Sequence, residues 1–178
     1  MRFRFAATMV GAALLVGALS HATVSGQAIT RRPQPPRLTV AVEPLNGPVA
    51  IGQSAALSIR ITPNPGIHVY APGNKDYIPV VVTVTQTPGL ATEAPAFPKA
   101  EDFFFGPLAE TVKAYSKSFV VTVRVRAESS LRSHAAAAGI ANVPVSGTVS
   151  YQACDEKVCF PPQSASFEGR LQVRVKGH

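Results

Sequence analysis

The stretch Phe119-Val120-Val121-Thr122-Val123-Arg124-Val125-Arg126 places apolar side chains at every second position. Successive side chains of a β-strand point to opposite faces of a sheet, so this alternation predicts a strand with one buried face. A strand of this kind belongs to a sheet that packs one face on a core. The predicted inner set is Phe119, Val121, Val123 and Val125, and the outer set is Val120, Thr122, Arg124 and Arg126.

Further runs show the same alternation, and turn-forming residues such as Asn46-Gly47-Pro48 and Pro63-Asn64-Pro65-Gly66 separate them. The only helix candidate is the alanine-rich segment from Ser129 to Ala138, which is short and is interpreted as a connection. Six or seven short strands without a long amphipathic helix predict an all-β fold, an antiparallel β-sandwich. The further runs lie within residues 38–42, 57–61, 78–84, 149–153 and 167–175.

The N-terminal residues have the layout of a secretory signal peptide. Arg2 and Arg4 give a positive start, an uncharged run follows from Phe5 to Leu19, and small residues come next. That run has 15 residues, whereas a membrane span needs about 20 apolar residues. We expect cleavage after Ala22, with Gly26 and Ala28 as other possible positions, and a retained N-terminal anchor is the alternative.

Cleavage there divides the sequence into three segments. Residues 1–22 are the signal peptide, residues 23–36 an extended proline-rich lead-in, and residues 37–178 the sandwich domain. The exported domain is expected to be soluble, with no membrane span, in an oxidising compartment where disulfides persist. The net charge of the whole sequence is +7, but its basic residues are scattered without interleaved aromatic residues, which argues against nucleic-acid binding.

Two cysteines are present in the 178 residues, in the segment Cys154-Asp155-Glu156-Lys157-Val158-Cys159. An exported chain could use this close pair for electron exchange, as a local staple or as metal ligands. A disulfide that closes a six-residue loop stabilises a fold by roughly 2 kcal/mol, against about 4 kcal/mol for a loop of some 60 residues. The pair is therefore a weak staple, and the redox and staple interpretations both stay open.

Metal binding is the weakest of the three interpretations. A closed zinc site needs two ligands besides the two thiolates. The histidines beyond the signal peptide are His68, His134 and His178, and none has a ligand-like spacing to the cysteines. We interpret His68, between Ile67 and Val69, as a strand-edge side chain. No metal or other cofactor is expected.

The segment Tyr151-Gln152-Ala153-Cys154-Asp155-Glu156-Lys157-Val158-Cys159-Phe160-Pro161-Pro162 closely resembles the signature of the N-terminal periplasmic domain of the thiol:disulfide interchange protein DsbD. The segment Pro65 to Ala71 resembles that family's Gly-Trp/Tyr-His-x-Tyr segment. The segment Glu101 to Gly106 resembles its acidic-aromatic-Gly cap loop. The resemblance spans about residues 37–175, and the fold that it implies is an immunoglobulin-like sandwich.

The resemblance also implies roles for individual residues. Cys159 would be the nucleophile that forms a mixed disulfide with a partner, and Cys154 the resolving thiol. An aromatic residue of the cap loop would shield the pair, with Phe104 as the best positional match and Phe105 as the alternative. The two residues that match positions near the family's active site, where they would tune the thiols or orient the cap, are Asp102 and Tyr70.

A periplasmic dithiol carrier is the function that the resemblance implies. Its partners would be thioredoxin-like periplasmic proteins, including those of cytochrome maturation. The membrane domain and the C-terminal thioredoxin-like domain of the family's full-length protein are not found in this sequence, so we expect a separate membrane electron transporter as reductant. The alternative is a redox-inactive β-sandwich adaptor in which Cys154 and Cys159 only clip one loop.

Overall fold

The computed structural model describes residues 34–134 and 139–175. The predicted signal peptide and most of the predicted lead-in lie outside these residues. The described residues belong to one compact unit, Gln34–His178. They contain β-strands and two short 3-10 helices and no α-helix, so the predicted all-β class is confirmed. None of the helices in the described part is long and apolar enough to cross a membrane.

The first sheet contains the strand that the opening stretch predicts. Its order is β1-β3-β9-β6, and all its pairings are antiparallel. In β9 the alternating Phe119, Val121, Val123 and Val125 are buried, whereas Arg124 is exposed. The structure therefore confirms both the predicted strand and the residues predicted to face the core. The strands are β1 (Leu38–Val42), β3 (Ser54–Pro63), β9 (Phe119–Ala127) and β6 (Leu90–Thr92).

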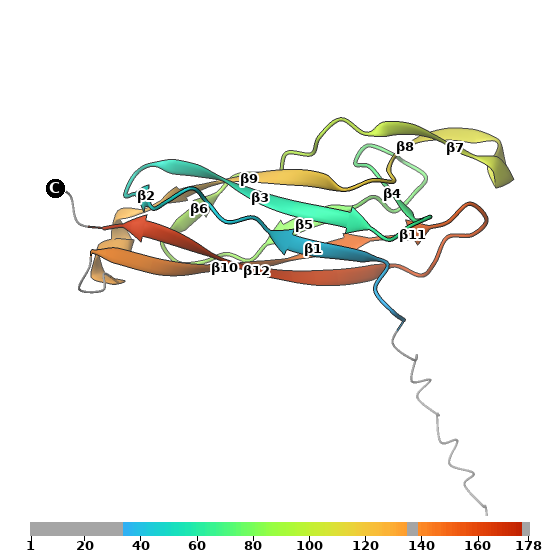
Figure 1. Ribbon diagram of the computed structural model, residues 1–178. Helices are drawn as coiled ribbons and strands as arrows, with labels where there is room; N and C mark the ends of the chain where they lie inside the picture. The colour runs from blue at the N-terminus through green and yellow to red at the C-terminus, as the bar shows by residue number, and fades with distance from the viewer. Residues whose placement is uncertain (1–33, 135–138, 176–178) are drawn as a thin grey trace, which may run out of the picture. The chain divides into compact units, whose positions relative to one another are not determined.

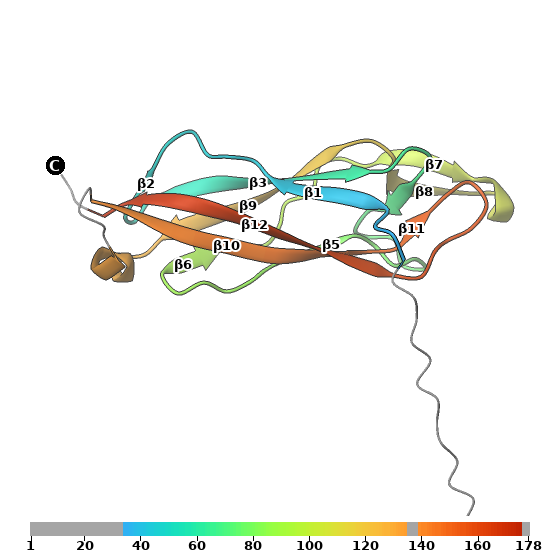
Figure 2. The same cartoon turned by 60° about the horizontal axis from the view of Figure 1, so that its bottom comes forward.

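The second sheet has the order β2-β12-β10-β5 and packs against the first to form an immunoglobulin-like sandwich (Figures 1 and 2). The pairing of β12 with β2 is parallel, and the others are antiparallel. Gly147 allows close packing here, because a Cβ would lie 2.2 Å from the Thr83 carbonyl oxygen and 2.4 Å from the Phe167 ring. The strands are β2 (Val49–Ala50), β12 (Gln163–Arg174), β10 (Ile140–Tyr151) and β5 (Val81–Val84).

A third sheet of order β11-β4-β8-β7 lies at one end of the sandwich, on the right in Figure 1. It has its own small apolar cluster, in which Tyr70, Val112 and Cys154 are buried, and this cluster is separate from the main core. The helix η1 (Gly106–Leu108) connects β7 to β8. The strands are β11 (Ala153–Cys154), β4 (His68–Tyr70), β8 (Glu110–Tyr115) and β7 (Glu101–Phe105).

Three details differ from the sequence predictions. Twelve strands are present in the described residues where six or seven were expected, because several are only two or three residues long. The run 78–84 forms a strand only from Val81; before it, Pro79 makes an isolated parallel bridge with Tyr70, and Ile78 is 47% exposed. The helix candidate is a 3-10 helix, η2 (Ser129–His134), and residues 135–138 of that candidate lie outside the described part.

Candidate functional site

Cys154 and Cys159 form a disulfide with a Cα–Cα distance of 4.0 Å. Their environments are opposite, because Cys154 in β11 is fully buried whereas Cys159 is exposed. After β11 the chain folds back on itself, so that the two cysteines pair as an antiparallel bridge and the Phe160 N–H donates to the Ala153 carbonyl at 2.8 Å. This turn presents one sulfur to solvent and keeps the other inside the third sheet.

The charged spacer between the cysteines is ordered by Asp155. Its Oδ1 accepts hydrogen bonds from the backbone N–H groups of Lys157 and Val158, both at 2.8 Å. These bonds favour the carboxylate and hold the pKa of Asp155 below its usual value, with smaller contributions from the charges of Arg37 and Lys157. The side chain thus fixes the turn that carries Cys159.

The residues after Cys159 are held by the segment that enters β1. The Arg37 guanidinium lies over the Phe160 ring, 3.2 Å from its centroid. The Gln163 side-chain amide donates to the Pro35 carbonyl at 3.2 Å, and the Gln152 side-chain amide donates to the Phe160 carbonyl at 3.1 Å. Contacts from both sides therefore stiffen the Cys-Phe-Pro-Pro segment at the position of the exposed sulfur.

Tyr70, which the sequence analysis predicts near the site, does lie beside the disulfide. Its hydroxyl oxygen is 3.6 Å from the Sγ of Cys159, and since a disulfide sulfur carries no proton, the hydroxyl is the donor. Burial, and secondly the charge of Glu110, raise the pKa of Tyr70, so the hydroxyl keeps its proton. Tyr70 can therefore donate to a thiolate on Cys159.

The Tyr77 ring packs against the ring of Tyr70. The two rings are 4.2 Å apart between centroids, and the Tyr77 hydroxyl donates to Glu110 Oε2 at 2.6 Å. That hydrogen bond is the main cause that raises the pKa of Tyr77 to about 12. Together Tyr77 and Glu110 fix the ring on which Tyr70 packs.

His68 is 1% exposed and lies in β4, an inner strand of the third sheet, directly opposite Cys154. Our interpretation of His68 as a strand-edge side chain is therefore wrong. Its Nε2 finds no hydrogen-bond partner within residues 34–134 and 139–175, and an unpaired buried polar group typically costs about 1–3 kcal/mol. Burial lowers the pKa of His68, and the charge of Asp155 opposes this shift in part.

The β7–β8 hairpin supplies the aromatic residues of the predicted cap. Phe103 packs against the cluster that contains Cys154, with its ring 3.9 Å from that of His68. Phe105 is buried on the same side of the strand, whereas Phe104 is 64% exposed, because alternate residues of a strand face opposite ways. Asp102 is exposed and forms an ion pair with Lys113 at 2.6 Å across the hairpin.

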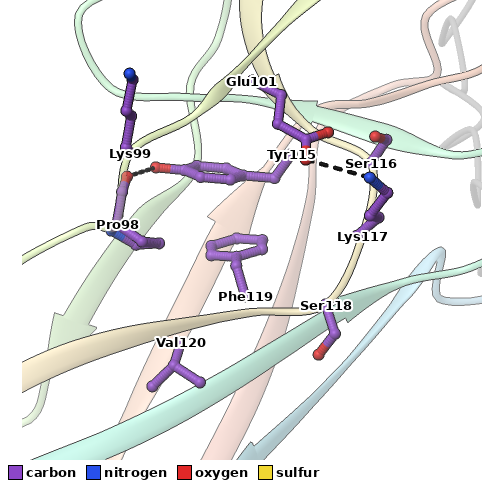
Figure 3. A pocket seen from close by; sticks show the side chains of 9 residues that line it. All are labelled: Pro98, Lys99, Glu101, Tyr115, Ser116, Lys117, Ser118, Phe119 and Val120. Carbon is purple, nitrogen blue, oxygen red and sulfur yellow. Dashed lines mark hydrogen bonds and ion pairs between the residues drawn. The ribbon is translucent and has the colours of Figure 1, made fainter.

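The described pockets lie away from the disulfide. One pocket of about 300 Å³ lies between the ends of β8 and β9, beside Tyr115, Lys117 and Phe119 (Figure 3). Neither cysteine lines it, nor do His68 and Tyr70. Within the described ranges no group of three or more His, Cys, Asp or Glu side chains could hold a metal ion.

Sequence reasoning missed four residues that the structure brings to the region of the cysteines. Tyr77 and Glu110 belong to no recognisable motif. Tyr77 lies in the loop after β4, and the pairing of β4 with β8 brings the strand of Glu110 to Tyr70. Phe103 and His68 did have a signal. Phe103 shares a strand face with Phe105, and His68 shares one with Tyr70, so the period-two rule would have placed each pair on one side.

The family model of the N-terminal part of the thiol:disulfide interchange protein DsbD matches residues 39–170. No curated protein sequence matches the chain. The N-terminal periplasmic domain of ScsB from Proteus mirabilis is similar in structure, with a TM-score of 0.43 and 14% identity. The similarity covers 78% of this chain but 44% of the ScsB chain, so this chain spans less than half of that length.

A second similar structure is that of AvmM, which catalyses macrocyclization in alchivemycin A biosynthesis. Its TM-score is 0.28 at 12% identity, over 76% of this chain and 88% of that chain. At such scores neither structure bears on function. The family model, in contrast, covers most of the sequence, including the cysteine segment and the strands around it. The chain therefore belongs to the family of the N-terminal domain of the thiol:disulfide interchange protein DsbD.

Proposed function

We propose that this protein is an exported thiol:disulfide interchange domain that carries two electrons in the Cys154/Cys159 pair. The observation that carries the proposal is the contrast between the two disulfide-bonded cysteines, because Cys159 is an exposed residue and Cys154 is fully buried. A large partner protein can reach only an exposed sulfur. The contrast thus supports Cys159 as the atom that exchanges with partners and Cys154 as the thiol that resolves the mixed disulfide.

The exchange follows from thiolate chemistry. A donor thiolate attacks the Sγ of Cys159, the S–S bond breaks, and the electron pair leaves on Cys154. A second donor thiol then releases Cys159, and the pair is reduced. In the second half of the cycle Cys159 attacks an oxidised acceptor and Cys154 resolves the mixed disulfide. The short separation between the cysteines makes the resolving step intramolecular and hence fast.

The surrounding residues have roles in the same proposal. Tyr70 donates to the Cys159 thiolate when it forms, because its hydroxyl already lies at hydrogen-bonding distance from that sulfur. The β7–β8 hairpin keeps water from Cys154, with Phe103 and Phe105 on the inner side and Phe104 at the solvent-exposed rim. Asp102 acts through the hairpin, by its ion pair with Lys113.

We further propose that the protein works in the periplasm after removal of residues 1–22, with residues 37–178 as the functional domain. Its partners are thioredoxin-like proteins, because their reactive cysteines can exchange disulfides with the exposed Cys159. Family membership supports this choice. The electron donor in this proposal is a membrane electron transporter, on the same ground.

A trapping experiment tests the function. Reduced Cys154→Ala protein is mixed with an oxidised thioredoxin-like protein, and non-reducing gel electrophoresis detects covalent complexes. We expect a mixed disulfide through Cys159, because the variant cannot resolve it. The Cys159→Ala variant, which keeps only the buried cysteine, is the matched control and should give no complex.

The reduction potential of the pair distinguishes a carrier from a loop clip. Equilibration of the wild-type protein with glutathione redox buffers should give a value above about −300 mV, within reach of thioredoxin-like partners. A value well below that, together with no trapped complex, would show that the disulfide is a structural clip in a redox-inactive adaptor.

A further inference from the structure

The environment of His68 is unusual for a structural residue. It is the one histidine, acidic or basic residue that is buried among the residues whose side-chain burial the structure describes. None of the residues that the structure describes gives its Nε2 a hydrogen-bond partner. A buried polar atom without a partner calls for an explanation, because nearly all such atoms in native proteins are paired.

The strand register places His68 against the buried cysteine. In the antiparallel pairing of β4 with β11, His68 and Cys154 are direct partners. Side chains of directly opposite residues lie on the same face of a sheet, with their Cβ atoms about 4.5–5.5 Å apart. The imidazole is therefore a cross-strand neighbour of the sulfur that becomes a thiol when the pair is reduced.

The other neighbours of His68 favour its neutral form. The ring centroids of Phe103 and Tyr70 lie 3.9 Å and 5.5 Å from the centroid of the imidazole ring, and both rings exclude water from His68. Burial lowers the pKa of His68. The charge of Asp155, which follows β11, raises this pKa by a smaller amount, so the pKa of His68 is lowered overall. A neutral imidazole has one bare nitrogen that can accept a proton.

We propose that His68 is the general base for Cys154 when this thiol resolves the mixed disulfide, an inference that rests on the proposed interchange function. The Cys154 thiol gives its proton to the imidazole, and the resulting thiolate attacks the Sγ of Cys159. The Cys154–Cys159 bond forms while the bond from Cys159 to the partner sulfur breaks. The electron pair leaves on the partner's sulfur, which takes up a proton from the imidazolium or from water.

A disulfide reagent can separate the two steps in the full chain. Reduced protein is mixed in a stopped-flow instrument with dithiobis-nitrobenzoate, which releases a coloured thiolate at each exchange. Attack by the exposed Cys159 gives the first equivalent, and resolution by Cys154 gives the second. The Cys154→Ser variant should release only the first equivalent, which assigns the two phases.

The base is tested by His68→Phe, which keeps a flat apolar ring, and by His68→Gln, which keeps a polar group without a comparable basicity. Both should slow the second phase by roughly 10²-fold, the lower end of the usual effect of a general base, and leave the first phase within about twofold. The matched control is Tyr115→Phe, which removes a buried hydroxyl from the neighbouring β8 and should change neither phase.

The pH profile gives a readout that a purely structural role would not change. Proton transfer from Cys154 to His68 leaves the total number of bound protons unchanged. The second-phase rate of the wild type should therefore vary little between about pH 6 and about pH 8. In His68→Phe the thiol must lose its proton to solvent, so the rate should rise about tenfold per pH unit.

Each outcome has a distinct meaning. A wild-type protein without a first phase would contradict the proposed interchange function itself. A normal first phase with a second phase that does not respond to either His68 variant would overturn the role of His68 alone. If circular dichroism shows that the variants do not fold, the wild type decides, because a second-phase rate that rises tenfold per pH unit excludes an internal base.

Discussion

Cys154 and Cys159 lie five positions apart in the chain, and burial alone gives them different chemistry. The exposed Cys159 can contact a partner protein, whereas the buried Cys154 contacts only its neighbours in the third sheet. The residues that contact each sulfur should therefore affect different steps. Tyr70 acts on Cys159, and Asp155 acts on the turn between the two cysteines.

Tyr70→Phe should make reduced Cys159 less reactive. The phenylalanine ring fills the same space but donates no hydrogen bond to the thiolate, and one such bond contributes ~1 kcal/mol. Alkylation of the reduced protein by iodoacetamide at neutral pH, followed by mass spectrometry of the Cys159 peptide, should be roughly fivefold slower. Tyr115→Phe is the control, and equal rates for wild type and Tyr70→Phe would contradict the role of the hydroxyl.

The backbone hydrogen bonds that Asp155 accepts should make the stability of the oxidised protein depend on pH. The pKa of Asp155 is lower in the folded protein than in the unfolded chain, so its stabilising effect is complete above the ordinary value of 3.8 and is lost as the pH falls through the folded-state pKa. The urea midpoint of Asp155→Ala should lie below that of the wild type at pH 7, and the difference should shrink on acidification. Glu156→Ala removes a neighbouring exposed carboxylate and should show no such trend.

At the scale of elements, the β7–β8 hairpin decides which aromatic ring covers Cys154. In β7, Phe103 and Phe105 lie on one face and Phe104 lies on the other. Shifting the alignment with the family's cap loop by one residue therefore changes which phenylalanine is predicted to shield the cysteines. The structure places Phe103 in the cluster with Cys154 and leaves Phe104 in solvent. The assignment of a shield to Phe104 remains a prediction, and mutation can test it directly.

Phe103→Ala should accelerate reduction of the disulfide by dithiothreitol severalfold. Its removal admits water to Cys154, and water stabilises the thiolate that leaves when Cys159 is attacked. Phe104→Ala, a substitution of the same size on the opposite face, should leave the rate within about twofold. The opposite order of effects, measured from the appearance of free thiols, would assign the shield to Phe104.

At the scale of the whole molecule, the sandwich core and the redox site are separate. The main core comes mostly from the two large sheets, with Val69, Tyr115 and Ala153 from the third sheet, and includes neither cysteine. The disulfide closes only a short loop, so its contribution to stability is small compared with that of the core. The protein should therefore keep its fold in both redox states.

Reduction by dithiothreitol should lower the free energy of unfolding by roughly 2 kcal/mol, as expected for a six-residue loop. Urea unfolding with and without the reductant measures the difference, and the β-sheet circular dichroism of the folded state should stay the same. Loss of the sheet signal on reduction would show that the disulfide is needed for the fold and would count against a carrier.

The sequence was sufficient for the sandwich because alternation in runs such as 119–126 depends only on which face of each strand is buried. The cysteine segment was likewise sufficient for the family. The surroundings of the disulfide were not predictable to the same degree. Alternation can place His68 on the same face as Tyr70, but it does not show which of the two- to six-residue strands pair. The position of His68 opposite Cys154 and that of Glu110 near Tyr70 therefore could not be predicted.

The separate cluster of Tyr70, Val112 and Cys154 has a consequence for how such a protein can evolve. Most substitutions that change a reactive centre also cost stability when the centre is part of the main core. Here the two sets of side chains hardly overlap, so selection can adjust the thiol chemistry while the scaffold stays intact. The same separation makes this end of the domain a suitable starting point for redox engineering.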